Sequence, residues 1–263
     1  MLEIKGLYKT FNRGTINEKT ALNGIDLELN EGDFVTMIGG NGAGKSTLLN
    51  AVAGTYLPDS GSITVDGDDI TMLPEHKRAK ILGRVFQDPM MGTAADMWIE
   101  ENLAIASRRG NRRTLKWAIT GKEREVYKEM LADLGLGLET RLKDKVGLLS
   151  GGQRQALTLL MAVIKRPKVL LLDEHTAALD PKTAKTVLEL SERFIKENNL
   201  TAMMVTHNMK DAIRYGNRLI MMNAGKIVFD ISGEEKKKLT VEDLMDAFHK
   251  TGTDNLSDRT LLS

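Results

Sequence analysis

The stretch GGNGAGKST at Gly39–Thr47 decides the fold, because it satisfies the phosphate-loop pattern. The apolar run FVTMIG precedes it and the amphipathic run STLLNAVAG follows it, which gives the order of strand, loop and helix that the pattern requires. Backbone N–H groups and a helix N-terminus can then both face phosphate groups. The stretch therefore predicts a nucleotide-binding α/β fold, with a glycine-rich turn of no function as the alternative.

The residue types within this loop suit the binding of phosphate. Glycines let the backbone wrap closely, Lys45 would reach the β- and γ-phosphates, and the Ser46 hydroxyl would bind magnesium. Lys45 would also stabilise charge in a transition state. The predicted nucleotide-binding residues of the loop are Gly39, Gly40, Asn41, Gly42, Ala43, Gly44, Lys45, Ser46 and Thr47.

Outside the loop, short apolar runs alternate with longer amphipathic stretches, which is typical of a largely parallel sheet joined by crossover helices. Three runs are apolar on both faces, as helix-covered strands should be: FVTMIG at 34–39, VLLLDE at 169–174 and TAMMVTH at 201–207. Ligands of such sheets bind outside the carboxyl ends of the strands. We therefore expect these three ends to converge on one site.

Other segments predict an antiparallel part and a helical part. GIDLELNEG at 24–32 and SITVDGDDI at 62–70 alternate polar and apolar residues, and LIMMNAGKIVFDI at 219–231 predicts a hairpin. Helix-favouring charged residues replace strand-like runs between 88 and 149, and after Ser232 we expect a loop with EEKKK and one short amphipathic helix. The predicted domains are a nucleotide-binding core with its antiparallel β subdomain over 1–88 and 149–231, an inserted helical subdomain over 89–148 and a C-terminal tail over 232–263.

The composition excludes several classes of function. The chain has 263 residues, 41% of them hydrophobic and 28% charged, which fits one large or two small globular domains. A net charge of +1 gives no global attraction to nucleic acid, and the absence of cysteine excludes disulfides, thiolate zinc sites and cysteine nucleophiles. No apolar run reaches about 18 residues and the start has no signal-peptide core, so we expect any membrane role to depend on a partner.

Two strand ends carry side chains suited to hydrolysis. Asp173 ends VLLLDE, where its carboxylate can hold magnesium, and Glu174 is placed to orient or deprotonate an attacking water as general base. His207 closes another buried strand, and its imidazole could bind the γ-phosphate and the attacking water. The alternatives are a solvated acidic loop and a structural histidine.

A second segment suited to binding phosphate lies about a hundred residues after the first. LLSGGQRQAL at 148–157 places a serine and two glycines before a helix-like run, which is the arrangement that binds phosphate at a helix N-terminus. A protein that binds one nucleotide does not need two such loops for the same phosphate group.

Taken in order, these motifs resemble the nucleotide-binding subunits of ATP-binding cassette (ABC) transporters, over roughly Leu2–Ile231. GGNGAGKST resembles the Walker A motif, VLLLDE the Walker B motif with its catalytic glutamate, VFQDP the Q-loop, LSGGQRQ the signature and AALD the D-loop. A phosphate loop alone is shared with many NTPases, whereas LSGGQ at this separation is close to diagnostic. The resemblance implies a RecA-like P-loop NTPase core and an active ATPase that uses ATP and Mg2+.

The resemblance also implies roles for further residues. Gln87 would contact magnesium and the attacking water, so the metal ligands would be Ser46, Gln87 and Asp173, and His207 would be the switch histidine. Two copies of the chain would pack head to tail, with the signature of one closing over the γ-phosphate held by the other. The residues acting in this way would be Ser150, Gly151, Gly152 and Gln153, with Asp180 in the D-loop. Phe11 would stack on adenine; the alternatives are that Tyr8 does so or that Phe11 is an ordinary core aromatic.

The partners implied are a second copy of the chain, a separate polytopic permease and a substrate-binding protein. The chain would then lie on the cytoplasmic face of the cell membrane and take part in bacterial uptake of an amino acid or similar small solute. The alternatives are a subunit of an exporter, or a soluble cassette ATPase acting on nucleic acid, ribosomes or iron–sulfur assembly. No long coiled coil, second cassette or basic excess is present, so transport is favoured and no nucleic acid is expected.

Three features stay open. His175 stands where the family usually has proline, and it either makes hydrolysis sensitive to pH or turns its side chain away from the phosphates. The basic stretch Ser107–Lys116 either approaches lipid or the permease, or is a solvated face. The segment Asn12–Lys19 is predicted to be a surface loop of unknown purpose.

One apolar group after the Q-loop also has two interpretations. Met90, Met91, Met97 and Trp98 either line an adaptable groove for a partner helix or form the small core of the helical subdomain.

Overall fold

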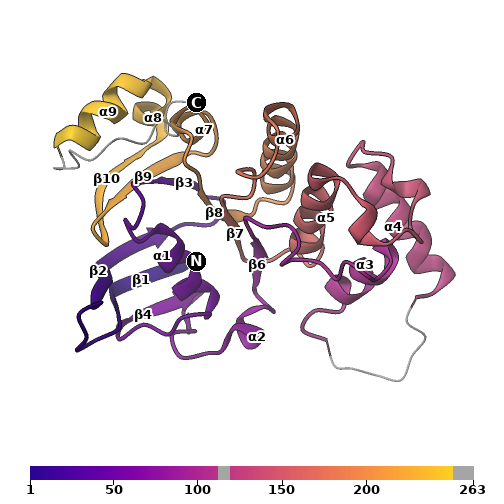
Figure 1. Ribbon diagram of the computed structural model, residues 1–263, viewed down its shortest axis with the longest axis horizontal. Helices are drawn as coiled ribbons and strands as arrows, with labels where there is room; N and C mark the ends of the chain where they lie inside the picture. The colour runs from indigo at the N-terminus through magenta and orange to yellow at the C-terminus, as the bar shows by residue number, and fades with distance from the viewer. Residues whose placement is uncertain (112–118, 251–263) are drawn as a thin grey trace. The chain divides into compact units, whose positions relative to one another are not determined.

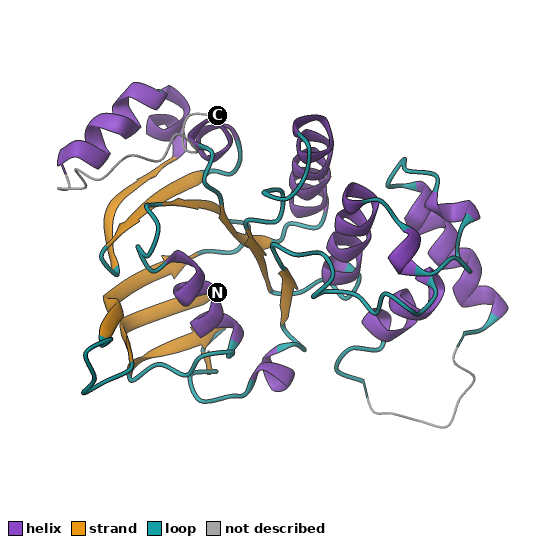
Figure 2. Ribbon diagram, in the orientation of Figure 1, coloured by secondary structure: helices purple, strands orange, loops and turns teal. Residues whose placement is uncertain are grey.

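The computed structural model describes residues 1–111 and 119–250 (Figure 1). The chain forms two compact units, one made of Met1–Arg78 and Asn199–Ser263 and the other of Ala79–Asn198. Both combine strands and helices (Figure 2). The predicted domain boundaries at 88/89, 148/149 and 231/232 differ from this grouping and stay a prediction. Within the described ranges, no helix is both long enough and apolar enough to cross a membrane.

The first unit contains the phosphate loop and most of the strands. Its elements are β1 (Leu2–Phe11), β2 (Lys19–Leu29), β3 (Phe34–Ile38), α1 (Lys45–Ala53), β4 (Ser60–Val65), β5 (Asp68–Asp69), α2 (Glu75–Arg78), β8 (Thr201–Val205), α7 (Met209–Arg214), β9 (Arg218–Asn223), β10 (Lys226–Ser232), α8 (Gly233–Lys238) and α9 (Val241–Lys250).

The strands of this unit form one antiparallel sheet and one mainly parallel group. The antiparallel sheet has the order β2-β1-β4-β5, and it contains both segments that alternate polar and apolar residues. In the other group, β3 pairs in parallel with β8 and with β9, while β9 and β10 form the predicted antiparallel hairpin. Every residue of β3 and β8 is buried, as the two-sided apolar pattern requires.

A buried arginine fixes the end of helix α1, which begins at the phosphate loop. The Arg78 guanidinium is fully buried and donates to the carbonyls of Ala51 and Val52 at 2.7 and 2.8 Å. It also donates to Leu73 and Thr71, each at 2.7 Å. These carbonyls include ones that a helix C-terminus leaves without partners, so a cation at this place stabilises the helix.

The second unit carries the helical part of the chain. Its elements are β6 (Leu82–Val85), α3 (Ile99–Ser107), α4 (Gly121–Ala132), η1 (Leu138–Thr140), η2 (Val146–Leu148), α5 (Gly151–Val163), β7 (Val169–Asp173) and α6 (Pro181–Glu197). Strands β6 and β7 pair in parallel, with Val85 opposite Leu172. Between these two strands the described residues form helices and turns with one isolated bridge, as the charged sequence predicts.

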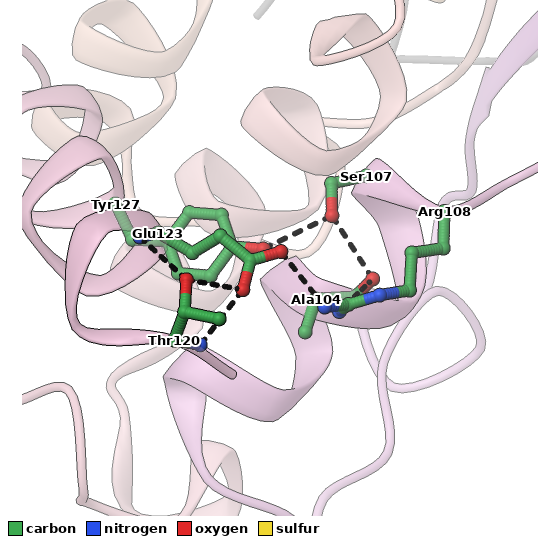
Figure 3. A network of polar contacts seen from close by, with 6 residues as sticks. All are labelled: Ala104, Ser107, Arg108, Thr120, Glu123 and Tyr127. Carbon is green, nitrogen blue, oxygen red and sulfur yellow. Dashed lines mark hydrogen bonds and ion pairs between the residues drawn. The ribbon is translucent and has the colours of Figure 1, made fainter. Parts of the chain in front are cut away.

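Helices α3 and α4 are joined by a polar network (Figure 3). Arg108 donates to a carboxylate oxygen of Glu123 at 2.8 Å, and the hydroxyls of Ser107 and Tyr127 lie 3.0 Å apart. The other Glu123 oxygen accepts from the backbone N–H of Thr120 at 2.7 Å, which caps α4. The first residues of the basic stretch therefore hold two helices together, and residues 112–116 of that stretch lie outside the described ranges.

The prediction for the C-terminal tail was wrong in one respect. EEKKK is part of helix α8 and not a loop. Glu234 and Glu235 occupy its first turn and three lysines its last, which suits the helix dipole, and the sequence analysis did not weigh this pattern. Beyond it, Leu244 and Phe248 of α9 pack into a core with Met209 of α7. Figure 1 shows α9 in yellow and α7 in orange.

One lysine of α8 is buried and binds the end of α7. Only 2% of Lys236 is exposed, and its ammonium donates to the carbonyls of Ile213 at 3.1 Å, Gly216 at 3.0 Å and Tyr215. Helix α7 follows His207, so this contact fixes the segment that carries the predicted switch histidine.

Replacing Lys236 with methionine should lower the free energy of unfolding by about 2 kcal/mol, because hydrogen bonds to a charged group are lost and the carbonyls stay buried. Urea unfolding of the whole chain measures this. Lys237→Met is the matched control, since Lys237 is exposed and pairs with Glu234 on the surface. Equal stability of the two variants would contradict the role given to Lys236.

Candidate active site

The phosphate loop lies between β3 and α1, and its lysine is held inside it. Lys45 is 5% exposed, and its ammonium donates to the carbonyls of Gly39 at 2.7 Å and Gly40 at 3.2 Å. The loop thus folds back onto its own lysine, while the predicted reach of Lys45 to the β- and γ-phosphates stays a prediction. Ser46, one residue later, is exposed.

Two loop glycines are required by close backbone packing. Gly39 has a φ of 152°, and a Cβ there would lie 2.3 Å from the carbonyl oxygen of Met222. Gly44 has a φ of 106°, and a Cβ there would lie 2.5 Å from the carbonyl oxygen of Ala21. No side chain fits at either position, so the loop is pressed against the backbones of β9 and β2.

The hairpin of β9 and β10 supports the same loop. The N–H of Gly225, in the turn of the hairpin, donates to the carbonyl of Ala43 at 2.9 Å. The carbonyl of Gly225 accepts from the N–H of Asn23 at 2.9 Å. The turn therefore connects the phosphate loop to β2, which fixes the loop between secondary structure elements on two sides.

His207 lies at the same end of the parallel strands as the phosphate loop. It follows β8, in which Val205 is opposite Met37 of β3, and the N–H of Thr206 donates to the carbonyl of Met37 at 3.1 Å. Two of the three predicted strand ends, those of β3 and β8, thus meet at one edge within the first unit.

Gln87, Asp173 and Glu174 belong to the second unit, at the carboxyl ends of β6 and β7. Because Val85 of β6 is paired with Leu172 of β7, the carboxyl ends of these two strands lie side by side. A carboxylate oxygen of Asp173 lies 3.8 Å from a guanidinium nitrogen of Arg84, and both side chains are 14% exposed. The sequence analysis did not single out Arg84.

Glu174 has a strained backbone. Its φ of 46° is in the left-handed region, which non-glycine residues rarely adopt, and its carbonyl accepts from the N–H of Ala177 at 3.0 Å. Such strain is concentrated at functional sites. Six residues later, Asp180 caps α6 by accepting from the N–H of Thr183 at 3.1 Å. Hydrogen bonding from the side chain of Thr183 and, second, from its backbone N–H lowers the pKa of Asp180.

The signature segment forms a capped helix N-terminus. The Ser150 hydroxyl accepts from the N–H of Gln153 at 3.3 Å, and the Gln153 side chain accepts from the N–H of Ser150 at 3.2 Å. Gly151 is exposed, whereas a Cβ on Gly152 would lie 2.0 Å from a methyl carbon of Thr183. The capping box therefore presents Ser150 and Gly151 to solvent, and Gly152 lets α5 approach α6.

Gln155 links the signature helix to the Q-loop, which the sequence analysis did not predict. It is fully buried, and its amide donates to the carbonyl of Phe86 at 3.1 Å, next to Gln87. The signal was a glutamine on an otherwise apolar helix face, where a buried amide needs a partner.

Phe11 lies at the end of β1 beside a second aromatic residue. The rings of Phe11 and Tyr56 meet edge to face with centroids 5.2 Å apart, and Tyr56 is 39% exposed. The ring of Tyr8 instead covers Gly24, where a Cβ would meet the Tyr8 hydroxyl at 2.7 Å. Tyr56 was not predicted from sequence, because it lies 45 residues from Phe11 along the chain.

His175 is buried and turned toward α6. It is 2% exposed, and its Nε2 lies 3.0 Å from the hydroxyl of Ser191. Burial lowers the pKa of His175 to about 4, so the ring is neutral at pH 7. Of the two interpretations of this residue, this contact favours a structural one.

The methionine and tryptophan side chains after the Q-loop are largely on the surface. Met90, Met91 and Trp98 are 43%, 69% and 42% exposed, and Met97 is partly buried. Three of the four therefore do not form a core. Across residues 1–111 and 119–250, no group of three or more His, Asp or Glu side chains is arranged to hold a metal.

These features together define a P-loop nucleotide-binding protein, and comparison with known proteins identifies its family. The family described as ABC transporter matches residues 22–177. The tyrosine transport ATP-binding protein of Clostridioides difficile is 46% identical over 248 residues, which cover 94% of this chain and 98% of that protein. The xylose/arabinose import ATP-binding protein of Sulfolobus acidocaldarius is 33% identical and covers 98% of each chain.

Solved structures give the same result. A dimeric ATP-binding cassette in a post-hydrolysis state, bound to ADP and Pi, has a TM-score of 0.75 at 28% identity, over 88% of this chain and 98% of that one. A cassette in its ADP conformation has a TM-score of 0.76 at 27% identity, over 95% and 98% of the two chains. The chain belongs to the ABC transporter family. It is an ATP-binding ATPase subunit, which confirms the predicted fold class and enzyme class.

The low pKa of His175 predicts how stability depends on pH. The neutral ring is favoured in the folded state, so its contribution is complete above the unfolded pKa of 6.5 and is lost as the pH falls toward about 4. At about 1.4 kcal/mol per pKa unit, the shift from 6.5 to about 4 corresponds to a full effect of about 3 to 4 kcal/mol.

The measurement is urea unfolding of the wild type and of His175→Gln between pH 7 and pH 4.5. We expect the wild type to lose more stability than the variant over this range. His76→Gln, at an exposed histidine, should keep the wild-type pH dependence. A parallel loss in wild type and His175→Gln would contradict the buried, neutral state of His175.

Proposed function

We propose that this chain is the ATP-hydrolysing subunit of a transporter, in which two copies enclose two ATP molecules and drive a separate membrane permease. The observation that carries the proposal is that two segments of one chain are built in a way that suits phosphate. One is the glycine loop around Lys45, and the other is the capped N-terminus at Ser150 and Gly151. The second feature would bind the γ-phosphate held by the other copy, as in the predicted head-to-tail dimer.

The hydrolytic step would be an in-line attack of water on the γ-phosphorus. Glu174 would accept a proton from the water as the new P–O bond forms, and the bond to the bridging oxygen of ADP would break. Lys45, His207 and the N–H groups of the loop would stabilise the charge that develops on the phosphate oxygens. The strained backbone of Glu174 supports this assignment, because strain is maintained only where the surrounding structure imposes it.

The residues present suit Mg2+ chemically. Ser46 offers an exposed hydroxyl, Gln87 an amide oxygen and Asp173 a carboxylate, and Mg2+ prefers such hard oxygen ligands. When bound, the metal would neutralise charge on the β- and γ-phosphates. Gln87 would also contact the attacking water, and the bond from buried Gln155 to Phe86 would steady its loop.

Phe11 is the better candidate for stacking on adenine. Tyr8 packs over Gly24, whereas Phe11 lies beside Tyr56. The base would then contact two aromatic rings. The remaining loop residues, from Gly40 to Thr47, would bind the phosphates through their backbone. Gln153 would act by holding Ser150 in the capping box, and Asp180 by fixing the start of α6.

The exposed side chains of Met90, Met91 and Trp98 support docking of a permease helix on the second unit. The relative named for tyrosine transport supports uptake of an amino acid as the cargo class. Under this proposal the chain lies on the cytoplasmic face of the membrane, and a substrate-binding protein delivers solute to the permease. The cargo itself would be chosen by the permease and its binding protein.

Replacing Glu174 with glutamine should reduce ATP hydrolysis at least a hundredfold, because the general base is lost, while ATP binding is kept. The dimer should then accumulate with ATP and Mg2+, which size-exclusion chromatography with light scattering detects. Glu189→Gln is the matched control and should leave turnover unchanged, since Glu189 is a surface residue paired with Lys185 on α6. Wild-type turnover in Glu174→Gln would overturn the catalytic assignment.

The transport role is tested with the same variant. Tagged Glu174→Gln protein, with ATP and Mg2+, is used to capture partners from gently solubilised cells of the native host, and mass spectrometry identifies them. We expect a polytopic membrane protein among the captured partners. Recovery of ribosomal, DNA-bound or assembly-factor partners without a permease would leave the ATPase intact and overturn the transport assignment.

A further inference from the structure

The segment Asn12–Lys19, predicted to be a surface loop of unknown purpose, is a loop over residues 12–18 that its own hydrogen bonds close, and Lys19 already belongs to β2. The N–H of Gly14 donates to the Glu18 carboxylate at 2.6 Å, and the N–H of Glu18 donates to the carbonyl of Thr15 at 3.0 Å. The N–H of Thr15 donates to the carbonyl of Asn12 at 3.1 Å. These bonds fix where β2 begins, and Lys19 is its first residue.

The loop places Lys19 beside the proposed nucleotide site. In the pairing of β1 with β2, Lys19 is directly opposite Phe11, the proposed adenine-stacking residue. The Lys19 ammonium reaches the phosphate loop, because it lies 2.8 Å from the point that a Cβ on Gly42 would occupy. Lys19 thus joins the two parts of the site, although 23 residues separate it from Gly42 in the sequence.

The charge of Lys19 suits an anion at this place. Lys19 is exposed, and among residues 1–111 and 119–250 no carboxylate forms an ion pair with it. Lys45 differs, since it is buried and bound to carbonyls of the loop. An ammonium beside a phosphate loop is a compact charge that can bind phosphate oxygens from outside the loop.

We propose that Lys19 is a nucleotide-binding residue, whose ammonium donates hydrogen bonds to the polyphosphate chain of the bound ATP or ADP. This inference rests on the proposed function, because it requires the phosphates to occupy the Gly39–Thr47 loop. The closed loop before Lys19 would position this second cation, and Lys19 would affect binding of the nucleotide and not the chemical step at Glu174.

The test uses the whole chain with Lys19→Met, Lys19→Arg and the control Lys5→Met, which changes another exposed lysine of the same sheet. Calorimetric titration with ATP and with ADP, each with Mg2+, gives the affinities. We expect Lys19→Met to weaken binding about three- to tenfold at low salt, as for an exposed charged hydrogen bond. The loss of nucleotide affinity in Lys19→Met should be smaller at 0.5 M salt. Lys19→Arg should bind nucleotide nearly as tightly as the wild type does.

ATPase assays separate binding from chemistry. Lys19→Met should raise the KM for ATP by a similar factor and leave kcat within twofold of the wild type. Thermal unfolding without nucleotide should give the same Tm for Lys19→Met and Lys5→Met, because neither side chain is buried.

The outcomes distinguish this inference from the function on which it rests. If the wild type binds and hydrolyses ATP while Lys19→Met matches Lys5→Met in affinity, the role of Lys19 is overturned and the ATPase assignment stands. A loss of ATP affinity that does not depend on salt and is also present in Lys19→Arg would show a structural effect of the loop. That result would also overturn the role of Lys19. If the wild type itself binds no ATP, the proposed function and this inference fail together.

Discussion

The packing of the phosphate loop against two strands is the constraint on which the site depends. At Gly39 and Gly44 the loop touches the backbones of β9 and β2 so closely that a Cβ would overlap a carbonyl oxygen. The shape of the loop is therefore set by its packing against these strands, and its own carbonyls hold Lys45. Preorganised donors of this kind bind developing charge without reorganisation during the reaction.

Distant parts of the first unit hold the phosphate loop and the helices that follow it and His207. Arg78 fixes the far end of α1, the Gly225 turn binds Ala43, and Lys236 binds the end of α7 beyond His207. Each is a hydrogen bond to a backbone carbonyl or from a backbone N–H, and the two cations are buried. The tail of the first unit thus fixes the end of α7, the helix that follows His207.

Local patterns allowed the strands, the hairpin and the phosphate loop to be predicted, because each depends on residues that are adjacent in the sequence. The boundary at EEKKK was missed because turn-by-turn charge placement was not weighed. Contacts between distant residues were also missed, namely Phe11 with Tyr56, Gln155 with Phe86 and the approach of Lys19 to Gly42. These depend on strand register and on helix packing, which a single sequence does not specify.

His175 shows how one departure from a family pattern is accommodated. Proline at this place would stiffen the backbone after Glu174, and histidine gives up that restraint. The buried bond to Ser191 of α6 supplies another, because it anchors the segment between Glu174 and the Asp180 cap to a long helix. A neutral imidazole can be buried in this contact at pH 7 at little cost in free energy. A protonated ring would lose the solvation of its charge. His175 is thus held by packing and a hydrogen bond, whereas proline would be held by its fixed φ angle.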